Sequence, residues 1–545
     1  MPATDPPWWQ SAVIYQVYPR SFQDTDSDGV GDLLGIRRRL PHLVELGVDA
    51  LWLSPVFPSP MADFGYDVAD YTGIDPLFGS MADFDALVGA AHAAGLKVIL
   101  DLVPNHTSDQ HAWFRQSRSS RSDPKRDWYI WRDPSPDGGP PNNWLSDFGG
   151  KAWEFDAATG QYYYHAFLAA QPDLNWRNPE VRAAIYDAMR FWLRRGVDGF
   201  RVDVIWHLIK DDQFRDNPAN PAFRPGDPPH HAVMPLYTTD RPEVHAVIEE
   251  MRRVVDEFPE RVLIGEIYLP LERLVAYYGR DLGGVHLPFN FALLQTAWSA
   301  RVVAKLIDGY EAALPHGGWP NWVLGNHDRV RVASRVGPGQ ARVAAMLLLT
   351  LRGTPTVYYG DEIGMQQVPI PPERVRDPFE RNVPGKKLGR DGCRTPMQWD
   401  TSPYAGFSDV EPWLPLGDDH RHNNVENQRA DQTSIYQLHR RLIELRCTRP
   451  ALRLGRYRPI AASGDLLLFV RERERERLLV ALNLGDEPLE VSLTNGRLAG
   501  TLLLSTAGDR AAEKVTGSLD LRGDEGAIVE LSDEARLPSQ TPLPR

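Results

Sequence analysis

Three acidic side chains follow apolar segments of the chain, at places where parallel strands would end. In GFRVDV (199–204), Arg201 and Asp203 alternate with apolar residues, so one face of a strand packs while the other presents both charges. A structural ion pair would explain this pattern equally well. If the pair faces a site, we expect Arg201 to keep the Asp203 carboxylate ionised, as a nucleophile requires.

The second and third candidates are Glu266 and Asp328. Glu266 lies near the end of the apolar run VLIGEIY (262–268), where a poorly solvated carboxyl group suits the role of a general acid. Asp328 ends WVLGNHD (322–328), where a helix cap is an alternative explanation. Together with Asp203 they favour glycoside hydrolysis. In that reaction one carboxylate attacks the anomeric carbon, a second protonates the leaving oxygen, and a third could stabilise the oxocarbenium-like transition state.

Eight short apolar runs supply the strands that would position these groups. Most are followed by helical periodicity, as in MADFDALVGAAHAAG, so strand and helix alternate along the chain. Continuous hydrophobic strands in such alternation indicate a parallel sheet covered by helices. Eight repeats predict an α/β fold of the (β/α)8 TIM barrel type, with active-site residues at the carboxyl ends of the strands. The runs span 12–18, 50–55, 97–103, 199–205, 262–268, 285–290, 322–328 and 354–360.

Two regions depart from this alternation. The segment 107–174, after the third strand, is rich in Pro, Gly, Asn and aromatic residues, which predicts an inserted subdomain rather than a structureless loop. From residue 455 onward, short alternating runs predict an antiparallel β-sandwich domain over 455–545. The barrel would then comprise 1–106 and 175–454. In the last domain, RERERER (471–477) predicts an exposed hairpin.

Composition argues against several classes of partner. The formal net charge of −13 disfavours nucleic acid, because binding a phosphate backbone needs clustered Lys and Arg. No apolar run reaches the roughly 18 to 20 residues that span a bilayer, so we expect no membrane partner. The chain has two cysteines, and its amino terminus (MPATDPPWWQ) lacks a basic region followed by an apolar core. These features predict a cytoplasmic protein. We expect it to be a monomer or a homodimer. The 16 tryptophans suggest a site for sugars or other flat ligands.

Four motifs resemble the signature regions of glycoside hydrolase family 13, the α-amylase family, in the same order and at matching strand ends. They are DLVPNHT (101–107), GFRVDV (199–204), GEIY (265–268) and GNHD (325–328). AVIYQVYPRSFQD, SPMADFGYD, QPDLNW and RTPMQWD are similar to the α-glucosidase and oligo-1,6-glucosidase branch. The resemblance implies a retaining, exo-acting α-glucosidase that releases glucose from the non-reducing end of small α-glucosides of the maltose or isomaltose type.

The resemblance also implies roles for individual residues. Asp203 would be the nucleophile that forms a β-glucosyl intermediate, Glu266 the acid/base, and Asp328 the carboxylate that binds ring hydroxyls. Two inversions would then retain the α configuration. Substrate contacts would come from a further set: His106, Arg201 and His327 as hydrogen-bonding groups, Tyr66 as a stacking partner, Asp63 and Arg394 on the terminal glucose, and Phe148 and Phe167 as aromatic platforms.

Two aspartates near these positions are ambiguous. Asp63 is preferred to Asp67 as the sugar ligand because it precedes the tyrosine by three residues, as in exo-acting relatives. Asp101 is expected to be structural, as in relatives, and is left out of the catalytic set.

The sequence leaves open which glycosidic linkage is preferred and which molecule accepts the glucosyl group. Val204 follows the nucleophile, and relatives that prefer α-1,6 bonds tend to carry valine there, although one apolar contact discriminates by only about 1 to 3 kcal/mol. A retaining intermediate can also pass glucose to another sugar, so transglucosylation, or sucrose isomerase or trehalose synthase-like transfer, is a close alternative. A non-catalytic binding subunit of the same fold is a remote one, since such members lack the acidic residues.

The loop DTDSDGVGD (24–32) concentrates acidic groups after the first strand. Its spacing resembles a calcium loop, but position twelve is Gly35 instead of glutamate and a strand precedes it, so a calcium sensor is not expected. Similar loops in this glycosidase branch hold a divalent ion. The resemblance thus implies a structural Ca²⁺, or Mg²⁺ in a small octahedral cavity. The candidate ligands are Asp24, Asp26, Asp28, Asp32 and the Val30 carbonyl. The alternative is a solvated turn in which Asp32 caps the next helix.

Overall fold

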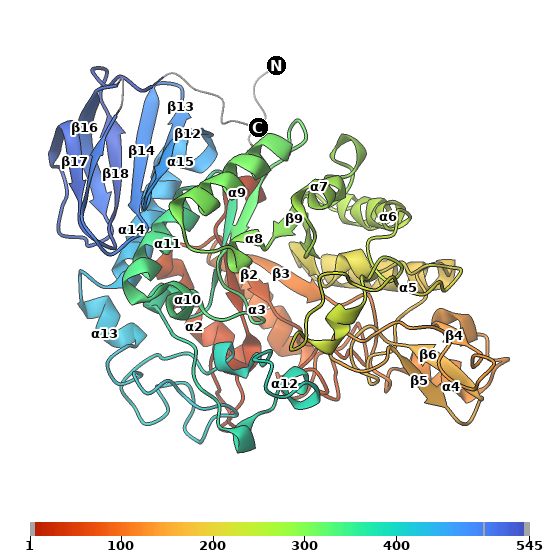
Figure 1. Cartoon of the computed structure of the whole chain (residues 1–545). Helices are drawn as coiled ribbons and strands as arrows, with labels where there is room; N and C mark the ends of the chain where they lie inside the picture. The colour runs from red at the N-terminus through yellow and green to blue at the C-terminus, as the bar shows by residue number, and fades with distance from the viewer. Residues whose placement is uncertain (1–5, 494–495, 539–545) are drawn as a thin grey trace.

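The computed structural model describes residues 6–493 and 496–538. Eight parallel strands form its central sheet, in the order β10-β11-β1-β2-β3-β7-β8-β9 (Figure 1). Each strand overlaps one of the eight predicted segments, so the (β/α)8 architecture is confirmed. The strands are β1 (Ile14–Val17), β2 (Ala50–Leu53), β3 (Lys97–Leu102), β7 (Gly199–Val202), β8 (Val262–Ile267), β9 (Leu287–Asn290), β10 (Asn321–Val323) and β11 (Thr354–Tyr358).

The seam between β9 and β10 is joined by a side chain. Pro288 in β9 has no N–H to contribute to a ladder. Instead, the backbone N–H of Asn290 donates to Oδ1 of Asn321 at 2.9 Å, and Nδ2 of Asn321 donates to the Pro288 carbonyl. The amide of Asn321 therefore takes the place of a peptide group, and the sheet curls into a nearly closed barrel.

Alternate residues of each strand face the barrel interior and the surrounding helices, as the period of two requires. In β2, Ala50 and Trp52 join one buried cluster with Ile14 and Ile264. Their neighbour Leu51 joins a larger cluster that includes residues of the outer helices. The polar side chains of the site lie above this buried apolar cluster, at the carboxyl ends of the strands.

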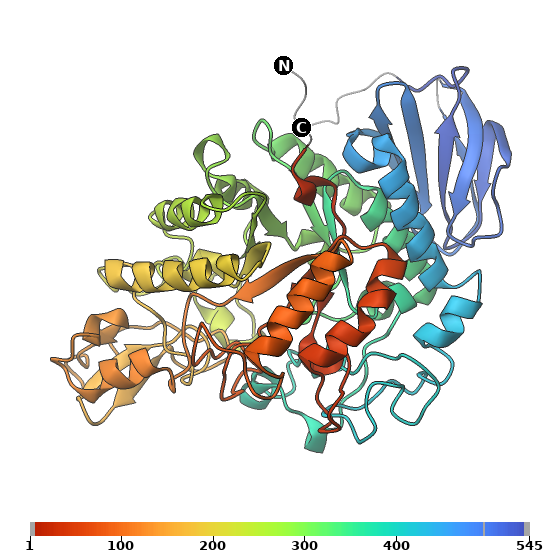
Figure 2. The ribbon, with the colours of Figure 1, turned by 180° about the vertical axis from the view of Figure 1, so that it is seen from behind.

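Helices cover the outside of the barrel, and Figure 2 shows α2 and α3 side by side there. α3 starts at a capping box formed by Ser80 and Asp83, and α2 ends at Gly47, whose φ of 89° suits glycine. The connection from β8 to β9 departs from the pattern, because its helices are all short: α7 (Leu271–Leu274), η5 (Val275–Tyr278) and η6 (Arg280–Leu282). The long helices are α2 (Leu33–Leu46), α3 (Met81–Ala93), α5 (Pro179–Arg194), α6 (Val244–Asp256), α9 (Ala300–Ala313), α11 (Pro338–Thr350) and α14 (Ile435–Thr448).

The segment between β3 and α5 carries its own small structure, the orange lobe of Figure 1. Packed aromatic side chains such as Trp144, Trp153 and Tyr164 give it a separate core. Its helix α4 (Ala112–Ser119) and its antiparallel strands β4 (Trp131–Arg132), β5 (Trp153–Asp156) and β6 (Gln161–Tyr164) all fall within the range predicted for the insertion. The exact domain limits stay predictions, and residues 1–5, 494–495 and 539–545 of the predicted ranges lie outside the described residues.

The predicted antiparallel β domain follows α15 (Pro450–Leu454) and appears blue in Figure 1. Its strands pair in the order β12-β13-β14-β18-β16-β17-β15, so the predicted sandwich takes the form of one sheet rolled into a half-barrel. The strands are β12 (Arg456–Ser463), β13 (Leu466–Arg473), β14 (Glu476–Asn483), β15 (Leu489–Ser492), β16 (Leu498–Ser505), β17 (Lys514–Leu521) and β18 (Gly526–Leu531).

The charged run 471–477 forms the β13–β14 hairpin, as predicted, and its turn residues Glu474 and Arg475 are exposed. Arg471 differs from the prediction because it is buried. Its guanidinium donates to the carbonyls of Thr350 at 2.5 Å and Gly455 at 2.8 Å, and so fixes the β domain to the barrel.

The last barrel connection, residues 359–434, is long and irregular and covers the mouth of the barrel. Its short helices are η7 (Asp361–Ile363), η8 (Pro372–Arg374), α12 (Pro378–Asn382), η9 (Asp391–Cys393) and α13 (Val425–Ala430). Across the described ranges, no helix is both long and apolar enough to cross a membrane.

Candidate active site

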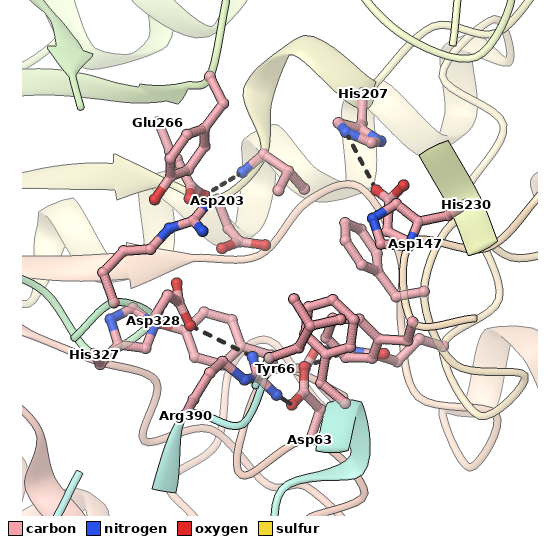
Figure 3. Close-up of a pocket in the computed structure, with 18 of the residues that line it drawn as sticks. Asp63, Tyr66, Asp147, Asp203, His207, His230, Glu266, His327, Asp328 and Arg390 are labelled. Carbon is pink, nitrogen blue, oxygen red and sulfur yellow. Dashed lines mark hydrogen bonds and ion pairs between the residues drawn. The ribbon is translucent and has the colours of Figure 1, made fainter. Parts of the chain in front are cut away.

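A cavity of about 350 Å³ opens at the carboxyl ends of the barrel strands (Figure 3). Asp203 directly follows β7, Glu266 lies within β8, and Asp328 lies in the loop after β10. All three predicted catalytic carboxylates line this one cavity. The predicted substrate residues Asp63, Tyr66, His106, Phe148, Phe167, Val204 and His327 line it too, whereas Arg201 and Arg394 support it from behind.

Arg201 is fully buried and serves three carboxylates at once. Its Nη1 donates to Oδ1 of Asp101 at 2.7 Å and to Oδ1 of Asp203 at 2.9 Å, and its Nη2 lies 2.7 Å from Oε2 of Glu266. The expectation that Arg201 alone keeps Asp203 ionised is therefore incomplete. Burial and the charge of Glu266 raise the pKa of Asp203, against the opposing effect of Arg201. One positive charge thus faces three carboxyl groups at the base of the cavity.

One oxygen of Glu266, Oε2, is held by the surrounding protein. Oε2 accepts the backbone N–H of Val204 at 2.9 Å in addition to its contact with Arg201. If Glu266 is the general acid, its proton is therefore carried by Oε1. The N–H of Val204 reaches Glu266 because Val204 adopts φ 36° and ψ 46°, a left-handed conformation that is costly for a β-branched residue.

Asp328 is held as an anion. Its Oδ1 accepts from Nη2 of Arg394 at 2.9 Å and from Nη1 of Arg390 at 3.4 Å. Burial opposes ionisation of Asp328, but its interaction with His327 and the positive charges of Arg390 and Arg394 outweigh it and lower the pKa of the carboxyl group. Arg394 does not reach the cavity itself, since its Nε donates to the His327 carbonyl and its side chain is fully buried. It positions Asp328 instead of closing the pocket.

Arg390 closes the pocket in the way expected of Arg394. Its Nη2 donates to Oδ1 of Asp63 at 2.6 Å and to Oδ1 of Asp377 at 2.6 Å. The structure also separates the two ambiguous aspartates. Asp63 lines the cavity, whereas Asp67 is fully buried and accepts the backbone N–H groups of Ala62 and Asp63.

Two neutral histidines and Tyr66 form the floor. Burial lowers the pKa of His327 to about 3 and that of His106 to about 4. Gln16 donates to Nδ1 of His327 at 2.8 Å, so Nε2 carries the proton and donates to the Tyr66 hydroxyl at 2.7 Å. That hydroxyl donates onward to Asp101 at 3.0 Å. Tyr66 stacks on His327 with ring centroids 5.2 Å apart, and its other face is available to the cavity.

Aromatic rings line the opposite wall. Phe148 lies edge-on to Phe167 at 5.5 Å and stacks on Phe379 at 4.8 Å. Phe167 also packs on His106 at 5.2 Å. Apolar faces of this kind suit the C–H faces of a sugar ring. Asp101, as expected, is structural: it accepts from Arg201, Trp52 and Tyr66 below the cavity.

Several lining residues were not anticipated from the sequence. Arg390, His230 and Phe379 come from irregular segments without periodicity, so no pattern marked them. Gln171 is the first residue of the motif QPDLNW, and its Nε2 lies 3.4 Å from Oδ2 of Asp63. The other unanticipated lining residues include Asp147, Trp206, His207, Tyr268, Arg329, Val330 and Lys387 to Gly389.

The acidic loop lies away from this cavity. One carboxylate oxygen from each of Asp24, Asp26 and Asp28 lies within 4.8 Å of the others, a set of hard oxygen donors that fits Ca²⁺ or Mg²⁺. Asp32 is not part of the cluster. Its oxygens accept from Thr25 and from the N–H of Gly35, so it caps α2 as the alternative reading stated. Desolvation is the largest effect that raises the pKa of Asp28, and the neighbouring carboxylates add to it.

The fold and the carboxylates at its strand ends define a barrel enzyme that breaks glycosidic bonds. The chain matches the family model for the alpha amylase catalytic domain over residues 16–455. The protein therefore belongs to the α-amylase family of glycoside hydrolases.

Individual relatives are similar over nearly the whole chain. A probable alpha-glucosidase of Rhizobium meliloti (strain 1021) is 44% identical over 509 residues, covering 91% of this chain and 92% of that protein. An oligo-1,6-glucosidase of Heyndrickxia coagulans is 40% identical over 519 residues, covering 88% and 92%. The crystal structure of an alpha-glucosyl transfer enzyme superposes with a TM-score of 0.91 at 43% identity, covering 97% of this chain and all (100%) of that one.

Proposed function

We propose that the protein is a retaining, exo-acting α-glucosidase that releases glucose from the non-reducing end of small α-glucosides. One observation carries the proposal: a single guanidinium, Arg201, contacts both Asp203 and Glu266. This bridge keeps the two carboxylates close, as double displacement requires, whereas inverting enzymes hold theirs about 6.5 to 9.5 Å apart to admit water. The ion pair between Asp63 and Arg390 closes one side of the pocket. It supports exo action, because a longer sugar chain would have no path on that side.

The geometry assigns atoms to the two steps. Oδ1 of Asp203 is held by Arg201, so Oδ2 attacks the anomeric carbon while Oε1 of Glu266 protonates the departing oxygen. The resulting glucosyl ester is then broken by water, whose proton returns to Glu266. Asp328, kept negative by Arg390 and Arg394, binds ring hydroxyls and opposes the positive charge that develops on the ring.

The linkage preference proposed here is α-1,6 or mixed. Val204 lines the cavity and places an apolar side chain beside the nucleophile. The relative named oligo-1,6-glucosidase supports this preference. Transfer of glucose to a second sugar, as in sucrose isomerase or trehalose synthase-like reactions, is the alternative, and the similarity to an alpha-glucosyl transfer enzyme favours it specifically. The non-catalytic alternative is disfavoured because all three carboxylates are present in one cavity.

A product assay tests the proposal. Native protein is incubated with maltose, isomaltose, sucrose or trehalose, and NMR follows the anomer of the first glucose released, which we expect to be α. Asp203→Ala should abolish hydrolysis of a nitrophenyl α-glucoside, while Asp212→Ala, an exposed aspartate on the same connection, should leave it unchanged. Equal rates for native protein and Asp203→Ala would show that the enzymatic assignment is wrong. New disaccharides as main products would establish transfer instead of hydrolysis.

We also propose that the loop 24–32 holds a structural Ca²⁺, with Mg²⁺ as the alternative. Asp24, Asp26 and Asp28 would supply the side-chain ligands, and the Val30 carbonyl would be a further candidate. Asp32 would support the loop through Thr25. The ion would tie the loop after β1 to the barrel and take no part in bond cleavage.

We infer a cytoplasmic location from the thiols. Cys393 is buried and Cys447 exposed, and both are free, as in a reducing compartment. The state of assembly, monomer or homodimer, stays a prediction.

A further inference from the structure

A second cavity of about 510 Å³ lies apart from the active site. Among the described residues, none lines both cavities. Three arginines and two aromatic rings form much of its wall: Arg20, Arg374, Arg376, Phe64 and Trp413. Arg20 lies shortly after β1, and the other two arginines lie in the long connection after β11. Three guanidinium groups thus meet at one pocket of a protein whose formal net charge is −13, and we call it the arginine pocket.

Arg20 is the buried member of this set and has no counter-ion. Only 8% of its surface is exposed, and within residues 6–493 and 496–538 no carboxylate forms an ion pair with its guanidinium. Its Nε is buried without a partner in the same ranges, and its Nη1 contacts Sδ of Met61 at 3.5 Å. Because arginine stays protonated in proteins, a buried guanidinium is costly unless an anion joins it. The pocket therefore offers a donor that the protein itself leaves unused.

The acidic neighbours of Arg20 are engaged elsewhere. Burial lowers the pKa of its guanidinium, Asp28 and Asp75 oppose this effect, and the positive charge of Arg376 adds to it. Both carboxylates accept backbone N–H groups within their own loops, at 2.7 to 2.9 Å. The like charges of Arg20 and Arg376 therefore lack an ion-pair partner among the described residues, and a bound anion would supply one.

The two outer arginines differ from each other. Arg374 pairs with Glu411 at 2.6 Å, whereas Arg376 is exposed and forms no ion pair in the part of the chain that the structure describes. Asp28 and Glu411 also line the pocket, so its three described guanidinium groups outnumber its two described carboxylates. A pocket with surplus positive charge concentrates anions even on an acidic protein.

The aromatic rings narrow the chemistry of the anion. The guanidinium carbon of Arg20 lies 5.2 Å from the ring centre of Phe64 and 4.7 Å from that of Trp413. The rings lie against a face of the guanidinium, so the N–H groups in its plane are the part left to bind a ligand. Such an edge matches two oxygens of one phosphate, and a second guanidinium can bind the remaining oxygens of this tetrahedral group. A planar carboxylate offers only two oxygens.

We propose that Arg20 and Arg376 form a binding site for a phosphate group, carried by inorganic phosphate or by an organic phosphate ester. Arg20 supplies the buried donors and Arg376 the outer charge, and the two aromatic rings hold Arg20 in place. The site lies apart from the bond-breaking carboxylates and does not depend on the proposed function. Phe64 directly follows Asp63 in the chain, so a bound phosphate also braces the loop that forms the glucose side of the active site.

Isothermal titration calorimetry tests the site. The native protein is titrated with inorganic phosphate and, separately, with glycerol 3-phosphate, an ester without a sugar ring that could enter the active site. We expect saturable binding of at least one of them with a Kd of about 1 mM, which two charged hydrogen bonds can supply. The ligand that binds more tightly identifies the source of the phosphate group.

Variants of the arginines locate the binding. Arg376→Gln removes an exposed charge, so we expect the fold to persist and the Kd to rise about tenfold. Arg20→Gln should abolish binding, and Arg376→Gln remains informative if the buried substitution prevents folding. Arg301→Gln, at an exposed arginine on α9, is the matched control and should leave the Kd unchanged.

Two results would overturn the proposal. One is the absence of saturable binding to native protein, or a Kd that Arg376→Gln leaves unchanged. The other is competition between phosphate and a nitrophenyl α-glucoside, which would place the anion in the active site. Native protein that cleaves no α-glucoside would overturn the proposed function alone, because the calorimetric comparison of native protein and Arg376→Gln needs no turnover.

Discussion

The Nη2 atom of Arg390 lies 2.6 Å from Oδ1 of Asp63, although 327 positions separate the two residues in the chain. The same guanidinium contacts Asp377 and Asp328, so one side chain ties the loop after β2 to the loop after β11. The pocket wall therefore depends on a contact between distant parts of the barrel rather than on any single segment.

Replacing Arg390 should impair binding of the terminal glucose. We expect Arg390→Lys to lower kcat/KM for maltose about a hundredfold, because an ammonium cannot serve three carboxylates and leaves buried charge unpaired. Steady-state kinetics measure the effect. Arg381→Lys, an exposed arginine on α12, is the control and should behave like the native protein. Retained activity in Arg390→Lys would remove Arg390 from the glucose subsite.

Val204→Thr should shift the linkage preference towards α-1,4 bonds. The hydroxyl adds a polar group at the cavity wall without changing the branching of the side chain, so the left-handed backbone and its N–H bond to Glu266 persist. We expect the ratio of maltose to isomaltose hydrolysis to rise by about 10- to 200-fold, the range open to a single contact. Val302→Thr, at an exposed position of α9, provides the comparison. An unchanged ratio would exclude Val204 as a determinant of specificity.

Removal of the proposed ion should affect stability and leave catalysis intact. Chelation should lower the melting temperature by several degrees, while initial rates measured well below it stay the same. Asp26→Asn should reproduce this lower melting temperature and abolish its response to the chelator, because Asp26 belongs to the acidic cluster. Differential scanning calorimetry with and without added Ca²⁺ checks both. A native protein indifferent to chelator would eliminate the site.

His111 should make stability depend on pH. It caps α4 through Nδ1, and burial lowers its pKa to about 4, below the usual value near 6.5. Between these two values the unfolded chain binds the proton and the folded chain does not, so stability falls as the pH is lowered. His111→Asn keeps a capping side chain without the titration, and should lose about 2 kcal/mol less than native protein between pH 7 and pH 5.

Urea unfolding at several pH values measures this difference. His422→Asn, at an exposed histidine, should show the same slope as the native protein. Parallel curves for His111→Asn and native protein would show that His111 does not contribute.

Asn321→Leu should loosen the barrel seam. The substitution leaves the N–H of Asn290 and the carbonyl of Pro288 unpaired in a buried place, which costs about 1 to 3 kcal/mol for each group. We therefore expect the unfolding free energy of Asn321→Leu to fall by about 2 to 6 kcal/mol in urea titrations. A Leu variant as stable as the native protein would show that the seam needs no amide.

Sequence patterns predicted the strands and the functional residues at their ends, because these depend on local order along the chain. The alternation in GFRVDV located the strand that Asp203 directly follows, and the run VLIGEIY located the strand that carries Glu266. The resemblance to known motifs selected Asp63, His106 and His327, which all line the cavity. These residues lie on or beside regular elements, and their positions follow from strand ends meeting at one face of a barrel.

Other features depend on contacts that no local pattern encodes. Arg390 comes from an irregular connection, and its role was assigned to Arg394, four residues later. The pKa of Asp203 depends on Glu266 and Asp101 on neighbouring strands as well as on Arg201. Arg471 looked like one more exposed charge in an alternating run, but it is buried at the domain boundary, where it donates to the carbonyls of Thr350 in the barrel and Gly455 at the start of the β domain.

The ion pairs of Arg390 also constrain the order of events in a turnover. In the proposed function they close the glucose side of the pocket, so both products are expected to depart through the mouth on the Asp147 side. The aglycone leaves first and clears the way for water, and free glucose, formed deeper, is released last. Glucose should therefore compete with fresh substrate for the empty pocket, and its accumulation should slow turnover.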